Sequence, residues 1–252
     1  MSSKVKKTLA VAAAGLLLAS GYASAGTTLK LGGSAAVGKG VIVANQAAIE
    51  KDTGLTLDIT VNGDANGLKL LNAGEVDVAM LGAPIEFAVK RLNAEAPGSI
   101  NPSEFVATQV GSDTVKFIVH PSNPVKTLTD TQLKEILTGK ITSWKDVGGP
   151  DQPILVVTGG PGLGARAIVV NLFLSGTDIV KTAREVQQLG QVAQVVAQAP
   201  TAIGYGNGGS ITDAVAVIPG VEVVTPLSLV TRGAPSPEAQ KLIKAATKYA
   251  PK

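Results

Sequence analysis

The chain has 252 residues, of which 45% are hydrophobic and only 3% are aromatic, so a packed interior must be built mainly from aliphatic side chains. The 22 basic residues exceed the 19 acidic ones by the three lysines of the first seven residues, so the rest of the chain has no positive surplus to attract nucleic acid or anionic lipid. The sequence contains no cysteine, which excludes disulfides and a lipid anchor on cysteine.

Residues 1–25 have the pattern of a secretory signal peptide. Lys4, Lys6 and Lys7 form a basic N-terminal region, and residues 8–20 form an apolar run that is short for a membrane span. The sequence Ala23-Ser24-Ala25 is a small-residue cleavage pattern. We expect cleavage after Ala25 and a periplasmic location. The alternative is a permanent membrane anchor, which we disfavour because no second spanning segment follows. The remaining chain is long enough for one large domain or two lobes of roughly 100 residues each.

After the leader, strand-like runs alternate with helical patterns. Residues 29–31, 55–61 and 76–81 resemble strands, whereas residues 34–51 and 66–73 have helical spacing. Such alternation predicts a parallel or mixed sheet covered by helices.

The pattern continues in the second half of the chain. Strands are predicted at residues 105–109, 114–120 and 154–158. One helix should begin after Thr129, which forms a capping box with Gln132, and another near Arg166 after a glycine-rich turn. The last helix should have Ser236 as its N-cap and Pro237 at its first position.

Two glycine-rich loops each lie between a strand and a helix. Residues 33–40 approach a nucleotide-triphosphate loop, but Gly40 replaces the serine or threonine that would hold magnesium; residues 160–165 fit the dinucleotide pattern, a weak signal when alone. A nucleotidase and a dehydrogenase are therefore minor alternatives. Both loops aim a helix N-terminus at the edge of a sheet, and two such termini facing each other would bind an anion without net positive charge. The alternative is that these glycines only make tight turns.

A family resemblance becomes visible between His120 and Gly149. The segments His120-Pro-Ser-Asn-Pro-Val, Leu128-Thr-Asp-Thr-Gln-Leu and Leu137-Thr-Gly-Lys-Ile-Thr-Ser-Trp-Lys-Asp-Val-Gly-Gly resemble the second-lobe signature of the phosphate-binding proteins of ABC importers. Weaker matches, at residues 33–34, 62–67, 75–79, 161–166 and 203–205, extend the resemblance over essentially the whole chain after the leader.

The resemblance implies an α/β fold of the two-lobed, type II periplasmic-binding-protein-like class, which closes over a small oxyanion by hinge motion. Lobe one should comprise residues 26–113 plus 206–252, and lobe two residues 114–205. Two crossings should join the lobes, near Val110 to Lys116 and near Ile203 to Gly206. Trp144 is expected as a core anchor of lobe two, and Tyr205 either helps the hinge or simply packs.

The resemblance also indicates the ligand-binding positions. They are Gly33, Ser34, Asp64, Gly82, Gly162, Leu163, Gly164, Ala165 and Arg166. Asp64 replaces a serine of the family, Gly82 replaces its ligand-facing aspartate, and Leu163 and Ala165 replace hydroxyl side chains. Because each hydrogen bond to a charged ligand contributes about 1.5–3 kcal/mol, we expect weakened phosphate binding. A protonated Asp64 could instead donate to a hydrogen-bearing oxyanion, and Arg166 could supply charge if its side chain turns inward.

The expected function is therefore binding of a small, phosphate-like anion for an ABC permease by a monomer with no cofactor, no metal and no enzymatic activity. One alternative is a partner-binding or sensory protein that kept the fold and lost its ion. A secreted phosphatase is a further alternative with little support, because the sequence lacks a metal cluster and a nucleophile paired with histidine. His120, the single histidine, is expected to be structural. Resemblance of fold alone does not decide among these functions.

Overall fold

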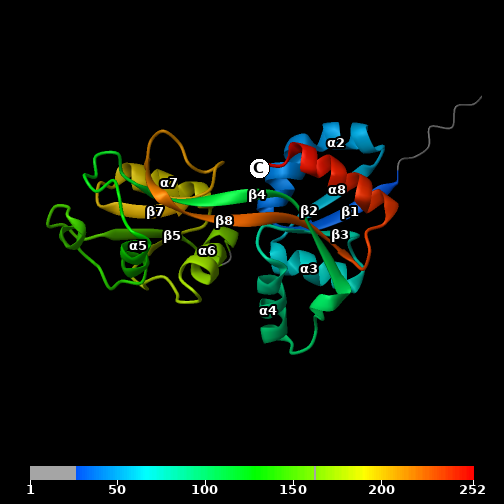
Figure 1. Cartoon of the computed structure of the whole chain (residues 1–252), viewed down its shortest axis with the longest axis horizontal. Coiled ribbons are helices and arrows are strands. Elements are labelled where there is room, and N and C mark those ends of the chain that lie inside the picture. Colours follow the sequence, from blue (N-terminus) through cyan, green and yellow to red (C-terminus); the bar gives the residue numbers. More distant parts are fainter. Residues whose placement is uncertain (1–26, 162) are drawn as a thin grey trace, which may run out of the picture.

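The computed structural model describes residues 27–161 and 163–252 and shows two lobes joined by two long strands (Figure 1). The leader, residues 1–25, lies outside the described residues. The strands are β1 (Thr28–Gly33), β2 (Thr56–Val61), β3 (Val78–Leu81), β4 (Phe105–Val119), β5 (Leu155–Gly159), β6 (Arg184–Val186), β7 (Ala202–Gly206) and β8 (Ala216–Arg232). They form one mixed sheet in the order β2-β1-β3-β8-β4-β7-β5-β6.

Helices cover both faces of this sheet in each lobe, as the alternation of strand-like and helical runs predicts (Figure 1). They are α1 (Ala35–Val37), α2 (Gln46–Thr53), α3 (Asp64–Ala73), α4 (Ile85–Glu95), α5 (Asp130–Leu137), α6 (Gly164–Ile168), α7 (Leu189–Gln198) and α8 (Pro237–Tyr249). A π-helical turn and a 3₁₀ turn connect α1 to α2, so the helix predicted up to residue 51 is one irregular helix. Another π-helical turn, Val169–Phe173, continues α6.

Strands β4 and β8 form the connection between the lobes. They pair antiparallel from Phe105 opposite Arg232 to Val119 opposite Ala216; β8 also pairs with β3 in the first lobe, and β4 with β7 in the second. The crossing predicted near Val110 to Lys116 therefore lies within β4.

The return crossing predicted at Ile203 to Gly206 is wrong, because these residues form β7 inside the second lobe, between β4 and β5. The return runs along β8 instead. Ile218 and Val223 pack in the second-lobe core, whereas Leu227 packs in the first-lobe core. The lobe boundaries of the sequence interpretation remain a prediction, and this packing favours moving the return to the middle of β8.

Each lobe has apolar layers on both faces of the sheet, because successive strand residues point to opposite sides. In β8, Leu229 joins the layer under α8 and Val230 joins the layer under α3 and α4. In β4, Phe117 and Ile118 divide in the same way between the two layers of the second lobe. Trp144 is 1% exposed and its indole N–H donates to the carbonyl of Thr201 at 2.9 Å, which confirms its role as a core anchor.

Candidate functional site

A cavity of about 530 Å³ lies between the two lobes. The first-lobe residues on its wall follow the carboxyl ends of β1, β2 and β3, which are parallel: Ser34, Asn62 and Gly82 come directly after these strands. The second-lobe residues follow the carboxyl ends of β5, β6 and β7, also parallel to one another, and include Leu163 and Asn207. The carboxyl edge of a parallel sheet is where α/β folds place their ligands.

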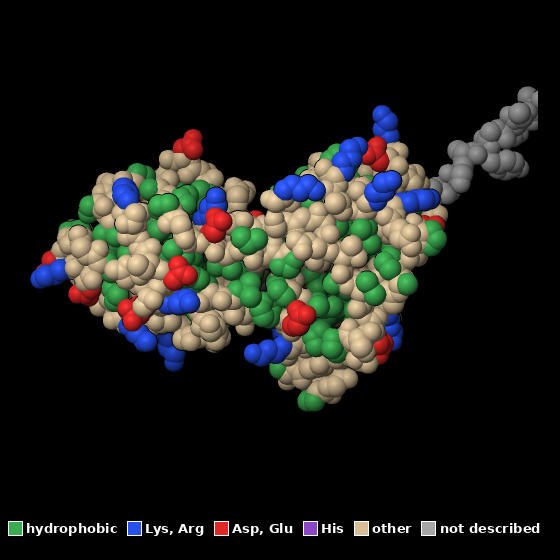
Figure 2. Space-filling model, in the orientation of Figure 1, with side chains coloured by type: hydrophobic (Ala, Val, Ile, Leu, Met, Phe, Trp, Pro, Cys, Tyr) green, Lys and Arg blue, Asp and Glu red, His purple; other side chains and the backbone are tan. Residues whose placement is uncertain are grey.

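In the space-filling view, a notch separates the lobes below the joining strands, and hydrophobic side chains are visible along it (Figure 2).

Three of the predicted ligand positions meet at one corner of the first lobe. The Ser34 N–H donates to the carbonyl of Met80 at 2.7 Å, and the Ser34 hydroxyl accepts from the Ala36 N–H at 3.2 Å, so Ser34 caps α1. The Asp64 carboxylate accepts from the Gly82 N–H at 3.0 Å, which connects the first residue of α3 to the end of β3. The sequence interpretation therefore brings Ser34, Asp64 and Gly82 together, as the structure does.

The Asp64 carboxyl is largely withdrawn from water. Burial raises its pKa above the ordinary value, and hydrogen bonds from the Gly82 N–H and the Ser34 hydroxyl oppose this shift in part. The charged form of Asp64 is thus disfavoured relative to an exposed aspartate. Asn62 also lines the cavity, and its side-chain oxygen is buried without a hydrogen-bond partner among the described residues.

Two glycines shape the same corner. A Cβ at Gly82 would lie 2.6 Å from the Ser34 hydroxyl oxygen, so a side chain at position 82 would displace Ser34. Gly33 does not line the cavity; it has φ 140°, and its carbonyl accepts from the N–H groups of Asn62 and Gly63, both at 2.9 Å. Gly33 thus positions the loop that leads to α3 rather than facing a ligand itself.

On the second-lobe side, Leu163, Gly164 and Ala165 line the cavity at the start of α6. Gly162 lies outside the described residues. The backbone before this turn is held by Tyr205, which is wholly buried; its hydroxyl contacts the Thr158 hydroxyl at 2.6 Å and accepts from the Gly159 N–H at 3.3 Å. Tyr205 therefore packs within the second lobe and supports the end of β5.

Arg166 is not among the described residues that line the cavity, so the condition under which its side chain would supply charge to a ligand is not met in this structure. Its guanidinium donates to Glu185 at 2.5 Å, to Asp178 at 2.9 Å and to the Gly159 carbonyl at 3.2 Å. These acceptors hold the side chain, which is 10% exposed, within the second lobe. Its charge is thus neutralised by two carboxylates away from the cavity wall.

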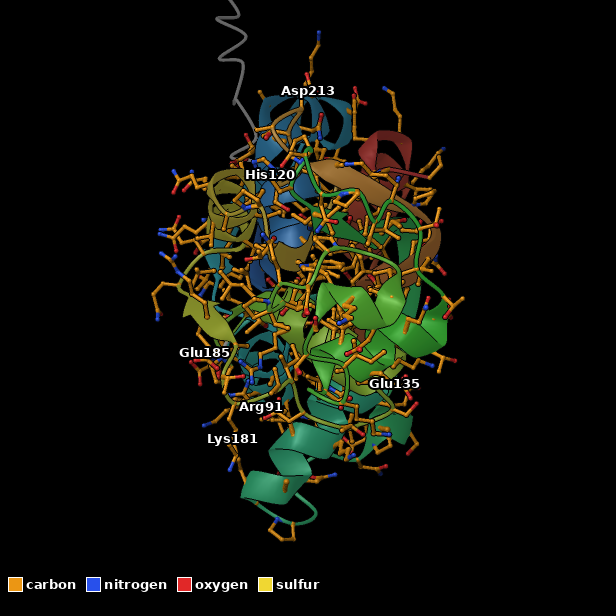
Figure 3. All side chains as sticks on the ribbon, turned by 90° about the vertical axis from the view of Figure 1, so that its left-hand side faces the viewer. Arg91, His120, Glu135, Lys181, Glu185 and Asp213 are labelled. Carbon is orange, nitrogen blue, oxygen red and sulfur yellow. The ribbon has the colours of Figure 1, made fainter. Side chains whose placement is uncertain are left out.

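The cavity wall includes polar residues that the sequence analysis does not single out. The Asp113 carboxylate, in the middle of β4, accepts from the Asn207 side chain at 2.7 Å. Arg91, on α4, is the cationic side chain among the described wall residues; it is 63% exposed, pairs with Glu95 at 3.4 Å, and extends from the molecule in the view of Figure 3. Position directly after a strand could have indicated Asn62 and Asn207, but nothing local in the sequence distinguishes Asp113 or Arg91.

The described residues contain no group of three histidine, cysteine or acidic residues that could hold a metal ion. The His120 ring accepts from the Ser122 N–H at 3.1 Å within a turn, and Figure 3 shows it well separated from Glu135 and Glu185. No helix in the described part of the chain is both long and apolar enough to cross a membrane.

Comparisons with known proteins agree with this arrangement. A family model described as a PBP superfamily domain matches residues 19–245. The phosphate-binding protein PstS of Bacillus subtilis is 29% identical over 195 residues, which cover 77% of this chain and 62% of that protein. The match thus spans less than two thirds of that relative. These matches confirm the resemblance that the residues from His120 to Gly149 indicate.

Two solved structures show the same fold. An ABC-type phosphate transport receptor from Vibrio cholerae superposes with a TM-score of 0.71 at 22% identity, covering 87% of this chain and 93% of that one. A putative phosphate ABC transporter substrate-binding protein with bound phosphate from Clostridium perfringens has a TM-score of 0.70 at 24% identity, covering 87% and 92%. The two-lobed, periplasmic-binding-protein-like architecture predicted from the sequence is therefore confirmed.

Proposed function

The chain belongs to the PBP superfamily, and from this premise we propose that it is a periplasmic solute-binding protein that captures a small oxyanion between its lobes for import by an ABC transporter. The observation that carries the proposal is the meeting of helix starts from both lobes, those of α1, α3 and α6, on one cavity. Helix N-termini present free N–H groups and a positive dipole end to an anion. The names of the relatives, which are phosphate-binding proteins, support the same ligand class and a binding protein rather than an enzyme.

The proposed site consists of backbone N–H groups near Ser34, Asp64 and Gly164; the Ser34 hydroxyl lies at this corner and donates to the Asp64 carboxylate. Gly82 and Ala165 keep side chains away from the ion. Asp64 opposes binding of a dianion while it is charged, so we propose that phosphate binds more weakly here than in a site with cationic ligands. Arg91 is the cationic side chain among the described wall residues and pairs with Glu95 of its own helix, so we propose that the site suits a hydrogen-bearing, weakly charged oxyanion.

Isothermal titration with phosphate and sulfate tests the proposal, using the wild type and Asp64→Asn. The amide keeps the shape and the acceptor for the Gly82 N–H but removes the charge. We expect weak phosphate binding by the wild type and binding about tenfold tighter by Asp64→Asn, because one like-charge repulsion of about 1.4 kcal/mol disappears. Asp64→Ser should also tighten binding. Asp58→Asn, an exposed substitution on β2, is the matched control for net charge and should leave the affinity unchanged.

Two outcomes would contradict the proposal. Tight phosphate binding by the wild type that Asp64→Asn abolishes would mean that the carboxyl holds the ligand, so the assigned role of Asp64 would be wrong. Absence of binding by either protein would favour the alternative, a partner-binding or sensory protein on the same fold.

A further inference from the structure

The cavity is much larger than an inorganic oxyanion. Its volume is about 530 Å³, whereas a water molecule takes up about 30 Å³ in the liquid, and a four-oxygen ion is only a few times larger. Pockets of roughly 300–1,000 Å³ are typical of organic ligands with many non-hydrogen atoms. An inorganic ion at the Ser34 corner would leave most of this volume to water.

Much of the rest of the wall is apolar. Aliphatic and aromatic side chains of both lobes and of the crossing strand β4 line it beside the polar residues Arg91, Asp113, Asn171 and Asn207: Ala83, Phe87, Val115, Leu163, Ile168 and Leu189. Closing such walls over a hydrated ion would release little apolar surface from water, since the space between them would remain filled by solvent. Closing them over an apolar group would bury that group and the walls together.

Apolar side chains of the first lobe reach the crossing strands beside the cavity. Ala83, which follows β3, is 9% exposed and belongs to the cluster that contains Val115 of β4 and the second-lobe core. Phe87, on α4, packs against the same cluster. An apolar layer thus continues from the first lobe along the crossing strands, and an apolar ligand body in the cavity would extend it.

The polar end of the cavity favours one kind of head group. The Asp64 carboxylate accepts from the Gly82 N–H and can accept a further hydrogen bond in its charged form. A ligand oxygen that carries a hydrogen would donate to Asp64, while its other oxygens would accept from the helix N–H groups.

From the cavity volume, its apolar wall residues and the Asp64 carboxylate at its polar end, we propose that the ligand is an organic oxyanion, with a hydrogen-bearing head at the Ser34 corner and an apolar body between Phe87 and Leu163. This inference rests on the proposed function and names its ligand class more closely. The body lies against side chains from both lobes, so its burial stabilises the closed form. Inorganic phosphate then fills only the head position.

A series of alkylphosphonates tests the inference, because all members share one head and differ in the apolar body. Inorganic phosphate, methylphosphonate, propylphosphonate and pentylphosphonate are titrated calorimetrically into the full-length mature protein at mildly acidic pH. We expect affinity to rise about fourfold for each methylene group that enters the cavity. Pentanol, which has the body without the anionic head, should bind far more weakly than pentylphosphonate.

Substitutions of cavity-wall residues test where the apolar body of the ligand lies. Leu163→Ala, on the second-lobe wall, should reduce the gain in affinity per methylene group. Phe87→Ala should do the same from the first lobe, and it provides a second reading if one variant folds poorly. Val224→Ala, at a side chain that is 57% exposed and outside the cavity wall, is the matched control and should keep the wild-type slope.

The outcomes separate this inference from the function on which it rests. Equal affinity for phosphate and for every phosphonate would overturn the organic ligand and leave oxyanion binding intact. No binding by any member would overturn the proposed function itself. A slope that persists unchanged in both Leu163→Ala and Phe87→Ala would show that the body does not lie between these walls.

Discussion

Arg166 follows the turn at the proposed anion site, but its guanidinium forms hydrogen bonds within the second lobe. Its three acceptors belong to the end of β5, to the segment after α6 and to β6, so one side chain connects three parts of the second lobe. The Asp178 and Glu185 side chains are 73% and 48% exposed and can be hydrated by water without the arginine. The Gly159 carbonyl is buried and accepts from the guanidinium and from the Thr158 hydroxyl, both at 3.2 Å, so without the arginine it keeps only an uncharged donor among these two.

We predict that Arg166→Met lowers the free energy of unfolding by about 1–3 kcal/mol, because the buried Gly159 carbonyl loses a charged donor. Oxyanion affinity should stay within about twofold of the wild type at a temperature where the variant is folded. Urea unfolding and titration calorimetry measure the two effects.

Arg166→Lys is the matched control: it keeps the charge but lacks the planar guanidinium, so it should recover only part of the stability. A loss of affinity with unchanged stability would instead place the guanidinium at the ligand.

At the residue scale, sequence reasoning could find which residues lie at the site but not always which way they point. Ser34, Asp64 and Gly82 each stand at a strand end or helix start, so the alternation of elements places them at one edge of the sheet. The direction of Arg166 depends on Asp178 and Glu185, which no local pattern connects to it. The unpartnered Asn62 oxygen depends on packing in the same way.

At the element scale, helix caps were predictable and the long return strand was not. The capping box of Thr129 and Gln132 is present in α5, and the Ser236 hydroxyl accepts from the Ala239 N–H at the start of α8. Both signals are local. By contrast, β8 contains Pro219 and Pro226, residue types that argue against a strand. Its pairing with β4 along most of its length carries it past them, with a register shift around Pro219.

The close packing of α3 on β1 gives a prediction at this scale. A Cβ at Gly67, in α3, would lie 2.5 Å from both the Gly32 carbonyl oxygen and the Gly33 Cα, and neither backbone atom can move aside easily. We expect Gly67→Ala to lower the free energy of unfolding by about 2–3 kcal/mol, since helix and strand must separate. Chemical denaturation measures the change.

The matched control for this substitution is Gly190→Ala, in α7, where a Cβ meets nothing within 4 Å. Alanine is the better helix former, so this variant should be more stable by up to about 1 kcal/mol. The opposite signs separate close packing from helix propensity. If Gly67→Ala were neutral or stabilising, the contact between α3 and β1 would not have the tightness described above.

At the scale of the whole molecule, β4 and β8 are both the connection and the place where the lobes can move. The register between them shifts between Gln109 and Gly111, which interrupts the regular ladder near the boundary of the lobes. The Asp113 carboxylate, beyond this shift, accepts from Asn207 at the end of β7. Two crossings could be expected from the family resemblance, but locating the second required the pairing of β8, because Pro219 and Pro226 interrupt its strand-like runs.

Closure of the lobes on a ligand is the prediction that belongs to this scale. The proposed ligand contacts walls from both lobes, whereas each lobe has its own apolar layers, so the lobes should approach one another as rigid bodies through bending of β4 and β8. Small-angle X-ray scattering should therefore show a smaller radius of gyration with saturating pentylphosphonate than without ligand. Trp144 emission should not change, because its indole lies in the second-lobe core and donates to Thr201 of the same lobe. A radius that stays constant while calorimetry shows binding would mean that the ligand occupies the cavity without closure. A shift in Trp144 emission would mean that the second lobe itself rearranges.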